Sequence, residues 1–213
     1  GDHPLPGSRG RGLGAERADG RAVGVELDHG EVLECDHILS TIGSAETNRL
    51  ITNKDATLPT HHQRLGFVET IYRLEDVSQS TLPKNKTIIF FNGSDKFSYK
   101  NPQDFVDFTS GVICFPGNFA GLPNITATEL RSTHLANYAR WKDLSNAPEQ
   151  YAKQKQATAL QSAQILEELV GSFRTNIVYE NTFTPVTVER YTAKINGAIY
   201  GSPDKIKDGY IGY

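Results

Sequence analysis

The stretch Leu65-Gly-Phe-Val-Glu-Thr-Ile-Tyr-Arg-Leu74 has the composition of a β-strand, since aromatic and β-branched residues dominate it. Three further runs share this character, at residues 87–92, 105–115 and 126–136. Pro, Gly, Asn and Asp cluster in the intervals between them. Short connections of this kind join antiparallel neighbours. The sequence therefore predicts a largely antiparallel sheet over residues 65–136, in which adjacent runs pair.

A single long helix is predicted after this sheet, from about residue 148 to residue 170. Asn146 and Glu149 suggest an N-terminal capping box, and Gly171 suggests the C-terminal cap. Its apolar residues recur at helical spacing on one face: Ala152, Ala159, Ala163, Leu166 and Val170. A helix with one apolar face packs across a sheet. The predicted fold class is therefore α+β, a largely antiparallel sheet covered by helix.

The N-terminal part of the chain predicts a hairpin followed by a returning strand. Apolar residues alternate from Val23 to Leu27, then Asp28-His29-Gly30 interrupts the run, and apolar residues resume at Val32. A three-residue connection that ends in glycine suits such a hairpin. The mostly apolar run at residues 37–42 predicts a short strand closed by Gly43. Residues 44–51 then predict a short helix capped by Ser44.

Composition excludes several classes of function. The 213 residues are 38% hydrophobic and carry 22 Lys+Arg against 25 Asp+Glu, so the net charge is −3 and a core can form. Without surplus positive charge, we expect no nucleic-acid partner. No run approaches the ~18 apolar residues of a membrane span. Methionine is absent even at position 1, so we expect a piece of a longer protein. The alternative is that modified methionines are missing from the sequence as written.

Familiar catalytic and metal motifs are also missing. No two of the six histidines lie four positions apart, and we predict no metal site. No G-x-S-x-G or P-loop motif occurs, which argues against hydrolase and NTPase functions. Residues 10–15 fit G-x-G-x-x-A, but a proline-rich segment precedes them instead of a strand, so we do not assign them to a dinucleotide. Cys35 and Cys114 predict two buried, reduced thiols.

Two segments resemble known flavoproteins. Residues 20–43 resemble the hairpin and returning strand of flavoproteins with two dinucleotide-binding domains. Phe183-Thr-Pro-Val-Thr-Val-Glu-Arg-Tyr-Thr192 and Gly197-Ala-Ile-Tyr-Gly201, together with residues 135–141, resemble the C-terminal half of the phytoene desaturase, carotenoid isomerase and retinol saturase-like family of FAD-dependent oxidoreductases. That family carries T-P-x-T-x-x-R-Y and G-[AGS]-x-Y-G stretches beside the flavin ring and the polyene channel.

The resemblance implies FAD as the cofactor and a carotenoid-like or retinoid-like isoprenoid as the hydrophobic substrate, which is desaturated, saturated or isomerised. It implies a sheet of the flavoprotein substrate-domain type with a remnant of an FAD/NAD(P)-binding α/β domain. By position, the cofactor contacts are Thr41, Ile42, Gly43, Arg190, Tyr191 and Gly201, and the substrate contacts are Gly197 and Tyr200. The alternative for Arg190 and Tyr191 is a surface arginine and a packed tyrosine on a strand. No catalytic acid or base is assigned, because the flavin itself transfers the hydride in such enzymes.

On this reading, residues 1–50 are the FAD-domain remnant, and residues 51–213 are the substrate-binding domain with the start of the return to the FAD domain. The glycine-rich strand and turn that hold FAD belong upstream of this chain, so we expect the chain alone to bind no FAD and to be inactive. The hairpin is expected to need a surface from the substrate domain or from a second copy. We expect a cytoplasmic protein and leave peripheral membrane association of the parent open. The alternative function is a non-catalytic module that binds an apolar ligand or a protein partner.

Overall fold

The structure, a computed structural model, describes residues 17–18, 21–27, 29–42, 44–52, 65–75, 82–121, 128–199, 205–206 and 209–210. The chain divides into two compact units. One comprises residues 1–62 with residues 201–213, and the other comprises residues 63–200. The functional roles assigned to residues 1–50 and 51–213 stay predictions.

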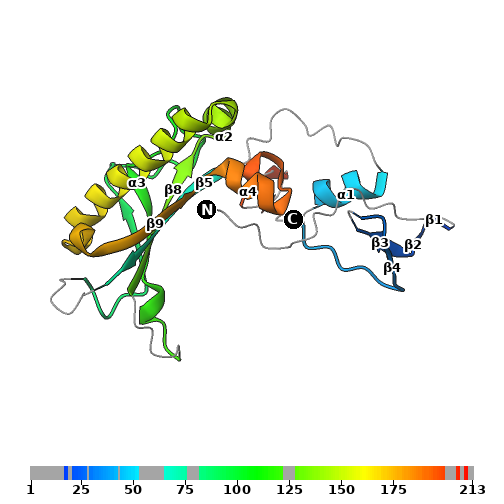
Figure 1. The fold of residues 1–213 in the computed structure, drawn as a ribbon, viewed down its shortest axis with the longest axis horizontal. Helices are drawn as coiled ribbons and strands as arrows, with labels where there is room; N and C mark the ends of the chain where they lie inside the picture. Colours follow the sequence, from blue (N-terminus) through cyan, green and yellow to red (C-terminus); the bar gives the residue numbers. More distant parts are fainter. Residues whose placement is uncertain are drawn as a thin grey trace. The chain divides into compact units, whose positions relative to one another are not determined.

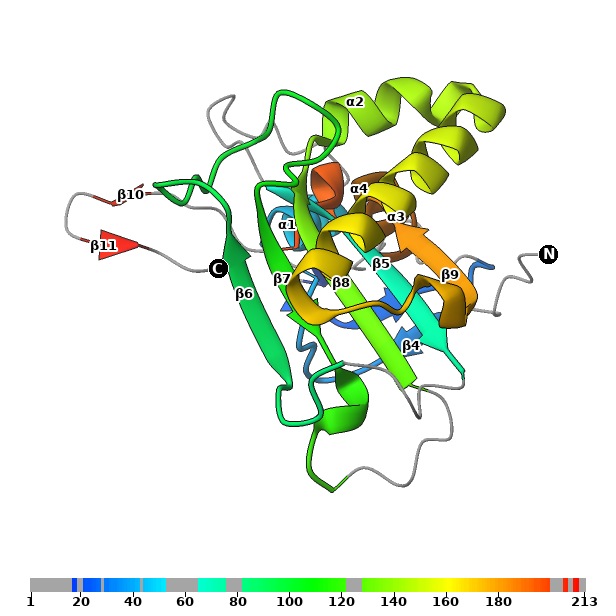
Figure 2. The ribbon, with the colours of Figure 1, turned by 90° about the vertical axis from the view of Figure 1, so that its left-hand side faces the viewer.

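The larger unit is built on a five-stranded antiparallel sheet with the strand order β6-β7-β8-β5-β9 (Figures 1 and 2). Its strands are β5 (Gly66–Leu74), β6 (Ile88–Asn92), β7 (Ser110–Cys114), β8 (Thr128–Ala136) and β9 (Ile177–Phe183). The four predicted strand runs all form, so the expected α+β class with an antiparallel sheet is confirmed at this level. The expected pairing of adjacent runs is wrong for β5, which pairs with β8 and β9 and not with β6.

The strand predicted from residue 105 begins only at Ser110, because a side chain interrupts the extended backbone. The Asp107 carboxylate accepts hydrogen bonds from the Thr109 amide at 2.9 Å and from the Thr109 hydroxyl at 2.6 Å. Aspartate commonly forms a turn in this way, by bonding the backbone two residues ahead. An isolated bridge from Val106 to Ala136 still ties this segment to the end of β8.

Helix α3 (Pro148–Val170) covers one face of the sheet, as predicted, and runs diagonally across the strands (Figure 2). Gly171 follows it with φ +96°, so its position just after the helix is confirmed. The predicted capping box is wrong: the residue before the helix is Ala147, without a side-chain cap. Asn146 instead belongs to the short 3-10 helix η3 (Leu144–Asn146) that precedes α3.

Two apolar clusters form the core of this unit. The larger lies between the sheet and the C-terminal half of α3, and includes Tyr72, Ile113, Leu130, Leu166 and Phe173. The smaller surrounds Trp141, which is fully buried on α2 (Tyr138–Asp143), and includes Val68, Val106 and Ala136. Four of the five residues predicted for the helix face are buried, the exception being Ala152.

The segment after β9 is a helix, α4 (Pro185–Thr192), whereas the alternative interpretation of Arg190 and Tyr191 placed them on a strand. The helix begins there because Thr184 caps it and Pro185 occupies its first turn, where proline's fixed φ and missing N–H cost nothing. The chain then turns through η5 (Ile195–Gly197) and bridges from Ala198 back to Gly66 on β5.

In the smaller unit, the predicted hairpin is confirmed. β3 (Gly24–Glu26) pairs antiparallel with β4 (Val32–Glu34), and Gly30 has φ +84° in the connection. Helix α1 (Ser44–Thr52) matches the predicted helix. Two further hairpins are short: β1 (Arg17–Ala18) with β2 (Arg21–Ala22), and β10 (Lys205–Ile206) with β11 (Gly209–Tyr210).

The predicted returning strand is wrong for residues 37–42, which form no strand. Leu39 is 92% exposed, and within the described residues this apolar run has no neighbouring strand to pair with. The expectation of buried thiols is also wrong for Cys35, which is exposed, whereas Cys114 on β7 is half-buried. In the described part of the chain, no helix combines the length and the apolar character needed to span a membrane.

Candidate functional site

The residues predicted to contact the cofactor or the substrate are divided between the two units. Thr41 is exposed and Ile42 half-buried in the smaller unit, and both precede α1. Arg190, Tyr191 and Gly197 lie in the larger unit, on α4 and η5. Gly43, Tyr200 and Gly201 lie outside the described residues, as does the glycine-rich stretch at residues 10–15. The candidate site that can be built from side chains is therefore centred on α4.

The N-terminus of α4 is anchored by a capping box. The Thr184 hydroxyl accepts from the Thr187 amide, and the Thr187 hydroxyl accepts from the Thr184 amide, each at 3.2 Å. Tyr151 on α3 adds a hydroxyl–hydroxyl bond to Thr184 at 2.5 Å. Pro185 is buried next to them. The start of α4 is thus fixed to the sheet and to α3.

The C-terminal half of α4 is held by Glu189, a residue that sequence reasoning did not single out. Its carboxylate accepts from the Tyr138 hydroxyl at 2.7 Å and from the Lys142 ammonium at 2.6 Å, both on α2. Burial raises the pKa of Tyr138, and the bond to Glu189 raises it further. The same carboxylate raises the pKa of Lys142. Both raised pKa values keep Tyr138 and Lys142 protonated at neutral pH, so each can donate to Glu189.

Arg190 and Tyr191 lie on the exposed side of this anchored helix. The Arg190 guanidinium lies over the Tyr191 ring, 5.7 Å from its centroid. No ion pair among the described residues engages Arg190. The pair offers a planar cation beside an exposed aromatic ring, which suits contact with an anionic or carbonyl oxygen or with a flat ring.

Gly197 is buried in a site that leaves no room for a side chain. It has φ +58°, and a Cβ atom there would lie 1.8 Å from the Pro185 carbonyl oxygen. The close approach of η5 to the start of α4 is sufficient to require glycine. Whether Gly197 also contacts substrate stays a prediction.

The two faces of the sheet differ in character. Tyr72 points from β5 toward α3, where its hydroxyl donates to the Ala159 carbonyl at 2.7 Å and burial raises its pKa to about 12. Since side chains alternate along a strand, the neighbours of such residues point to the opposite face. That open face carries half-buried or exposed apolar side chains: Phe67, Ile71, Ile88, Phe90 and Val112.

The open face also carries an ion-pair cluster that contains both signs of charge. Arg131 on β8 pairs with Glu129 on the same strand and with Glu69 on β5, the latter at 3.7 Å. Thr133 donates a further bond to Glu69 at 3.2 Å. Because these charges pair with one another, they leave apolar patches on either side that an uncharged ligand can cover.

Under α3, a buried series of hydrogen-bonded polar side chains connects the sheet to the helix. The His134 Nδ1 lies 3.1 Å from the Ser110 carbonyl oxygen, which can only accept, so Nδ1 carries the proton. In the neutral ring, Nε2 then accepts from the Ser162 hydroxyl at 3.0 Å, and Ser162 is 2.6 Å from the Ser132 hydroxyl. Burial lowers the pKa of His134 despite the opposing Ser110 bond and Asp107 charge. All three side chains are buried, and their place in the core indicates a structural role.

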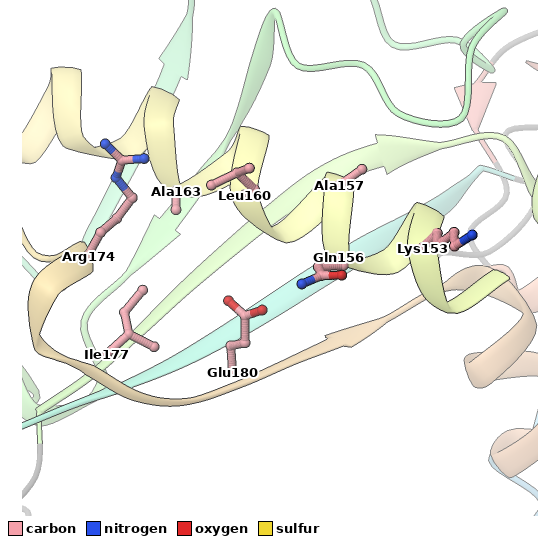
Figure 3. Close-up of a pocket in the computed structure, with 8 residues that line it drawn as sticks. All are labelled: Lys153, Gln156, Ala157, Leu160, Ala163, Arg174, Ile177 and Glu180. Atoms are coloured by element: carbon pink, nitrogen blue, oxygen red, sulfur yellow. The ribbon is translucent and has the colours of Figure 1, made fainter. Parts of the chain in front are cut away.

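A groove of about 690 Å3 separates α3 from the edge strand β9 (Figure 3). Glu180 points from the strand toward the helix, and Gln156 points toward the strand (Figure 3). Apolar and charged side chains mix along its walls: Lys153, Gln156, Ala157, Leu160, Ala163, Arg174, Ile177 and Glu180. Such a lining is less suited to a long apolar substrate than the open face of the sheet is.

Comparison with known proteins gave no relative: no family model, no curated protein and no solved structure matches this chain. Among the described residues, no group of three or more His, Cys, Asp or Glu side chains could hold a metal ion. The arguments for function therefore rest on the motifs and on the geometry above.

Proposed function

We propose that this chain forms the substrate domain, with part of the FAD domain, of an FAD-dependent oxidoreductase of the phytoene desaturase type. The substrate is a carotenoid-like or retinoid-like isoprenoid, which the enzyme desaturates, saturates or isomerises. In this proposal the sheet is of the flavoprotein substrate-domain type. The hairpin and α1 belong to the remnant of the FAD-binding domain.

The observation that carries the proposal is the two-sided sheet. α3 covers one face, while the other keeps Phe67, Ile71, Ile88, Phe90 and Val112 half-buried or exposed. A polyene offers almost no hydrogen-bonding groups, so it is recognised through apolar surface of this kind. The T-P-x-T-x-x-R-Y motif supports the same function, because it builds α4 and displays Arg190 and Tyr191 together.

The described residues fit part of an FAD molecule. Arg190 is exposed, and no ion pair among the described residues engages its guanidinium, which can therefore meet a flavin oxygen. Thr41 and Ile42, in the smaller unit, stay predicted cofactor contacts. When bound, FAD supplies the hydride or electron transfer. In the proposal, Arg190 orients the flavin edge, α4 fixes Arg190, and the apolar face of the sheet holds the polyene and excludes water.

The test measures flavin binding and turnover in the longer protein encoded by the natural open reading frame. Arg190→Ala should weaken FAD affinity and lower turnover, because it removes a charge-assisted hydrogen bond. Arg140→Ala is the matched control, since Arg140 is an exposed arginine on the neighbouring helix α2. The 213-residue chain alone should bind no stoichiometric FAD in a fluorescence or calorimetric titration.

Two results would count against the proposal. Tight FAD binding by the 213-residue chain would overturn the assignment of the main cofactor contacts to an upstream glycine-rich turn. An open reading frame without that turn, encoding a protein that binds polyenes but no flavin, would favour the alternative, a non-catalytic module for an apolar ligand. The open face of the sheet fits that alternative as well, whereas the Arg190–Tyr191 pair on α4 favours the flavoenzyme, so flavin content decides between them.

A further inference from the structure

Between α3 and the sheet, a band of polar side chains separates the two apolar clusters. On β8, Ser132 and His134 lie between Leu130 of the larger cluster and Ala136 of the smaller one. Seven side chains, each at most 3% exposed, belong to this band, which we call the polar seam: Thr70, Tyr72, Ser132, His134, Thr158, Ser162 and Thr182. A buried hydroxyl destabilises a core unless a new hydrogen bond replaces the one that it loses to water.

Three hydroxyls of the polar seam donate hydrogen bonds within the protein. The Tyr72 hydroxyl donates to the Ala159 carbonyl on α3 at 2.7 Å. His134 Nε2 accepts from Ser162, so the Ser162 hydroxyl in turn accepts from Ser132. These bonds fasten the middle of α3 to β5 and β8.

Thr158 on α3 has no such bond. It is 1% exposed, and no donor or acceptor among the described residues lies within hydrogen-bonding distance of its hydroxyl oxygen. A threonine in a helix can bond the carbonyl one turn earlier, but Thr158 does not. On the sheet, Thr70 of β5 and Thr182 of β9, which we call the threonine pair, share one hydroxyl–hydroxyl bond at 3.0 Å. One of their two hydroxyl hydrogens therefore has no acceptor within the described part of the chain.

The contacts of α3 place Thr158 over the threonine pair. One turn earlier, the Lys155 ammonium lies 3.5 Å from the Asn181 side-chain oxygen on β9, and one turn later the Ser162 hydroxyl bonds β8. β5 lies between β9 and β8 in the sheet. As α3 crosses these strands diagonally (Figure 2), it carries Thr158 over the junction of β9 and β5, which the threonine pair spans.

Thr158 has space beside it and a route to solvent. Its neighbours on the buried face of α3 have small side chains: Ala159, Ser162 and Ala163. The groove between α3 and β9 is lined on the helix by Ala157, which precedes Thr158 (Figure 3). On the strand it is lined by Glu180, which shares one strand face with Thr182. A molecule as small as water can enter the polar seam from this groove.

We propose that one ordered water molecule is bound in the polar seam, where it accepts hydrogen bonds from the Thr158 hydroxyl and from the threonine pair. Its two lone pairs take the two hydroxyl hydrogens that the protein groups leave over, so the site offers the polar partners that a buried water needs. With this water, hydrogen bonds tie α3 to β9, β5 and β8 in turn. The inference goes beyond the proposed function and does not depend on it.

The first test is Thr158→Val in the 213-residue chain, since valine keeps the shape of threonine and lacks its hydroxyl. With a bound water, the substitution breaks a hydrogen bond, and the ratio of folded to unfolded chain in urea denaturation should fall at least about fivefold. Without a bound water, valine would remove the cost of an unbonded hydroxyl and the ratio would rise. Thr192→Val is the matched control, because Thr192 is exposed on helix α4. Its ratio should change about twofold or less.

The second test counts water molecules directly. Oxygen-17 relaxation dispersion detects water held inside a protein, and Thr158→Val should hold one such molecule fewer than the unmodified chain or Thr192→Val. A crystal structure of the unmodified chain should show this water about 3 Å from the Thr158 hydroxyl.

A Thr158→Val chain that is more stable than the unmodified chain, or that holds as many internal waters, would overturn the proposal. So would a crystal structure in which the Thr158 hydroxyl bonds a protein group, a result that requires no variant to fold. Neither measurement involves flavin, so this proposal and the proposed function can fail independently.

Discussion

Two different constraints can require glycine at a position: a left-handed backbone, and a lack of room for a Cβ atom. Three glycines of this chain separate the two. Gly197 combines φ +58° with backbone atoms where a Cβ would lie, Gly121 has φ +80° in open space, and Gly117 has neither constraint. The sequence alone does not show which of these two constraints acts at each glycine. Their roles depend on what the chain brings next to them, which in the case of Gly197 is the carbonyl of Pro185 twelve positions earlier.

Alanine substitutions at these glycines should therefore rank in a fixed order. Gly197→Ala should lower the free energy of unfolding by at least about 2 kcal/mol, since a strained backbone is combined with an unavoidable clash. Gly121→Ala should cost about 1 kcal/mol from the left-handed backbone alone. Gly117→Ala should be neutral or slightly stabilising. Urea denaturation of the three variants measures the order, and a neutral Gly197→Ala would refute the packing of η5 against Pro185.

His134 gives the larger unit a pH-dependent stability. Its folded-state pKa lies below the ordinary value of 6.5, so below pH 6.5 the unfolded chain binds a proton that the folded chain does not. The free energy of unfolding should hence be highest above pH 6.5. It should fall as the pH drops below that value, by at most about 1.4 kcal/mol per pH unit.

The measurement is urea denaturation between about pH 5 and pH 7.5, above the range in which carboxylates such as Glu167 begin to lose their contribution. His134→Asn removes the titrating group, and its stability should vary less with pH than that of the unmodified chain. His29→Asn is the control, because His29 is exposed. A slope that persists in His134→Asn and vanishes in His29→Asn would contradict the assignment.

At the scale of the elements, the sequence predicts those helices and strands whose periodicity and end signals lie within one short segment. The strand runs, the hairpin at Gly30 and helix α3 each carry a periodicity and a terminating glycine or proline. The predicted strand runs do not include β9, although Ile177-Val-Tyr-Glu-Asn-Thr-Phe183 is rich in β-branched and aromatic residues. The alternative that places Arg190 and Tyr191 on a strand is wrong, because Thr184 and Pro185 start a helix that contains both residues.

Two leucines on the last turns of α3 should separate burial from helix propensity. Leu166 is fully buried against the sheet, whereas Leu169, three positions later, is 49% exposed. Leu166→Ala should therefore cost about 2–5 kcal/mol of unfolding free energy. Leu169→Ala should cost about 0.5 kcal/mol or less. Thermal or urea unfolding compares the two, and similar losses would mean that α3 does not lie on the sheet through this face.

At the scale of the whole chain, organisation was predictable where contacts are local in sequence and unpredictable where they are not. The sheet order places β9 beside β5 across more than 100 residues, and no local pattern records that pairing. In the candidate site, too, only the features that are local in sequence could be predicted. The motif singled out Arg190 and Tyr191, but Glu189 and its partners Tyr138 and Lys142 emerged only when α2 and α4 came together.

The two units should differ sharply in amide hydrogen exchange. β5 and β8 pair over nine residues in the middle of the sheet and pack on α3, so their amides should exchange only through global unfolding. The β3–β4 hairpin has three residue pairs, and every residue of β4 is exposed. A two-stranded hairpin is marginal in water, so amides of residues 24–34 should exchange orders of magnitude faster in a verified monomer. If the hairpin amides exchanged as slowly as those of β5 and β8, the hairpin would have to be stabilised by packing on another surface. Protection that rises with protein concentration would identify that surface as a second copy of the chain.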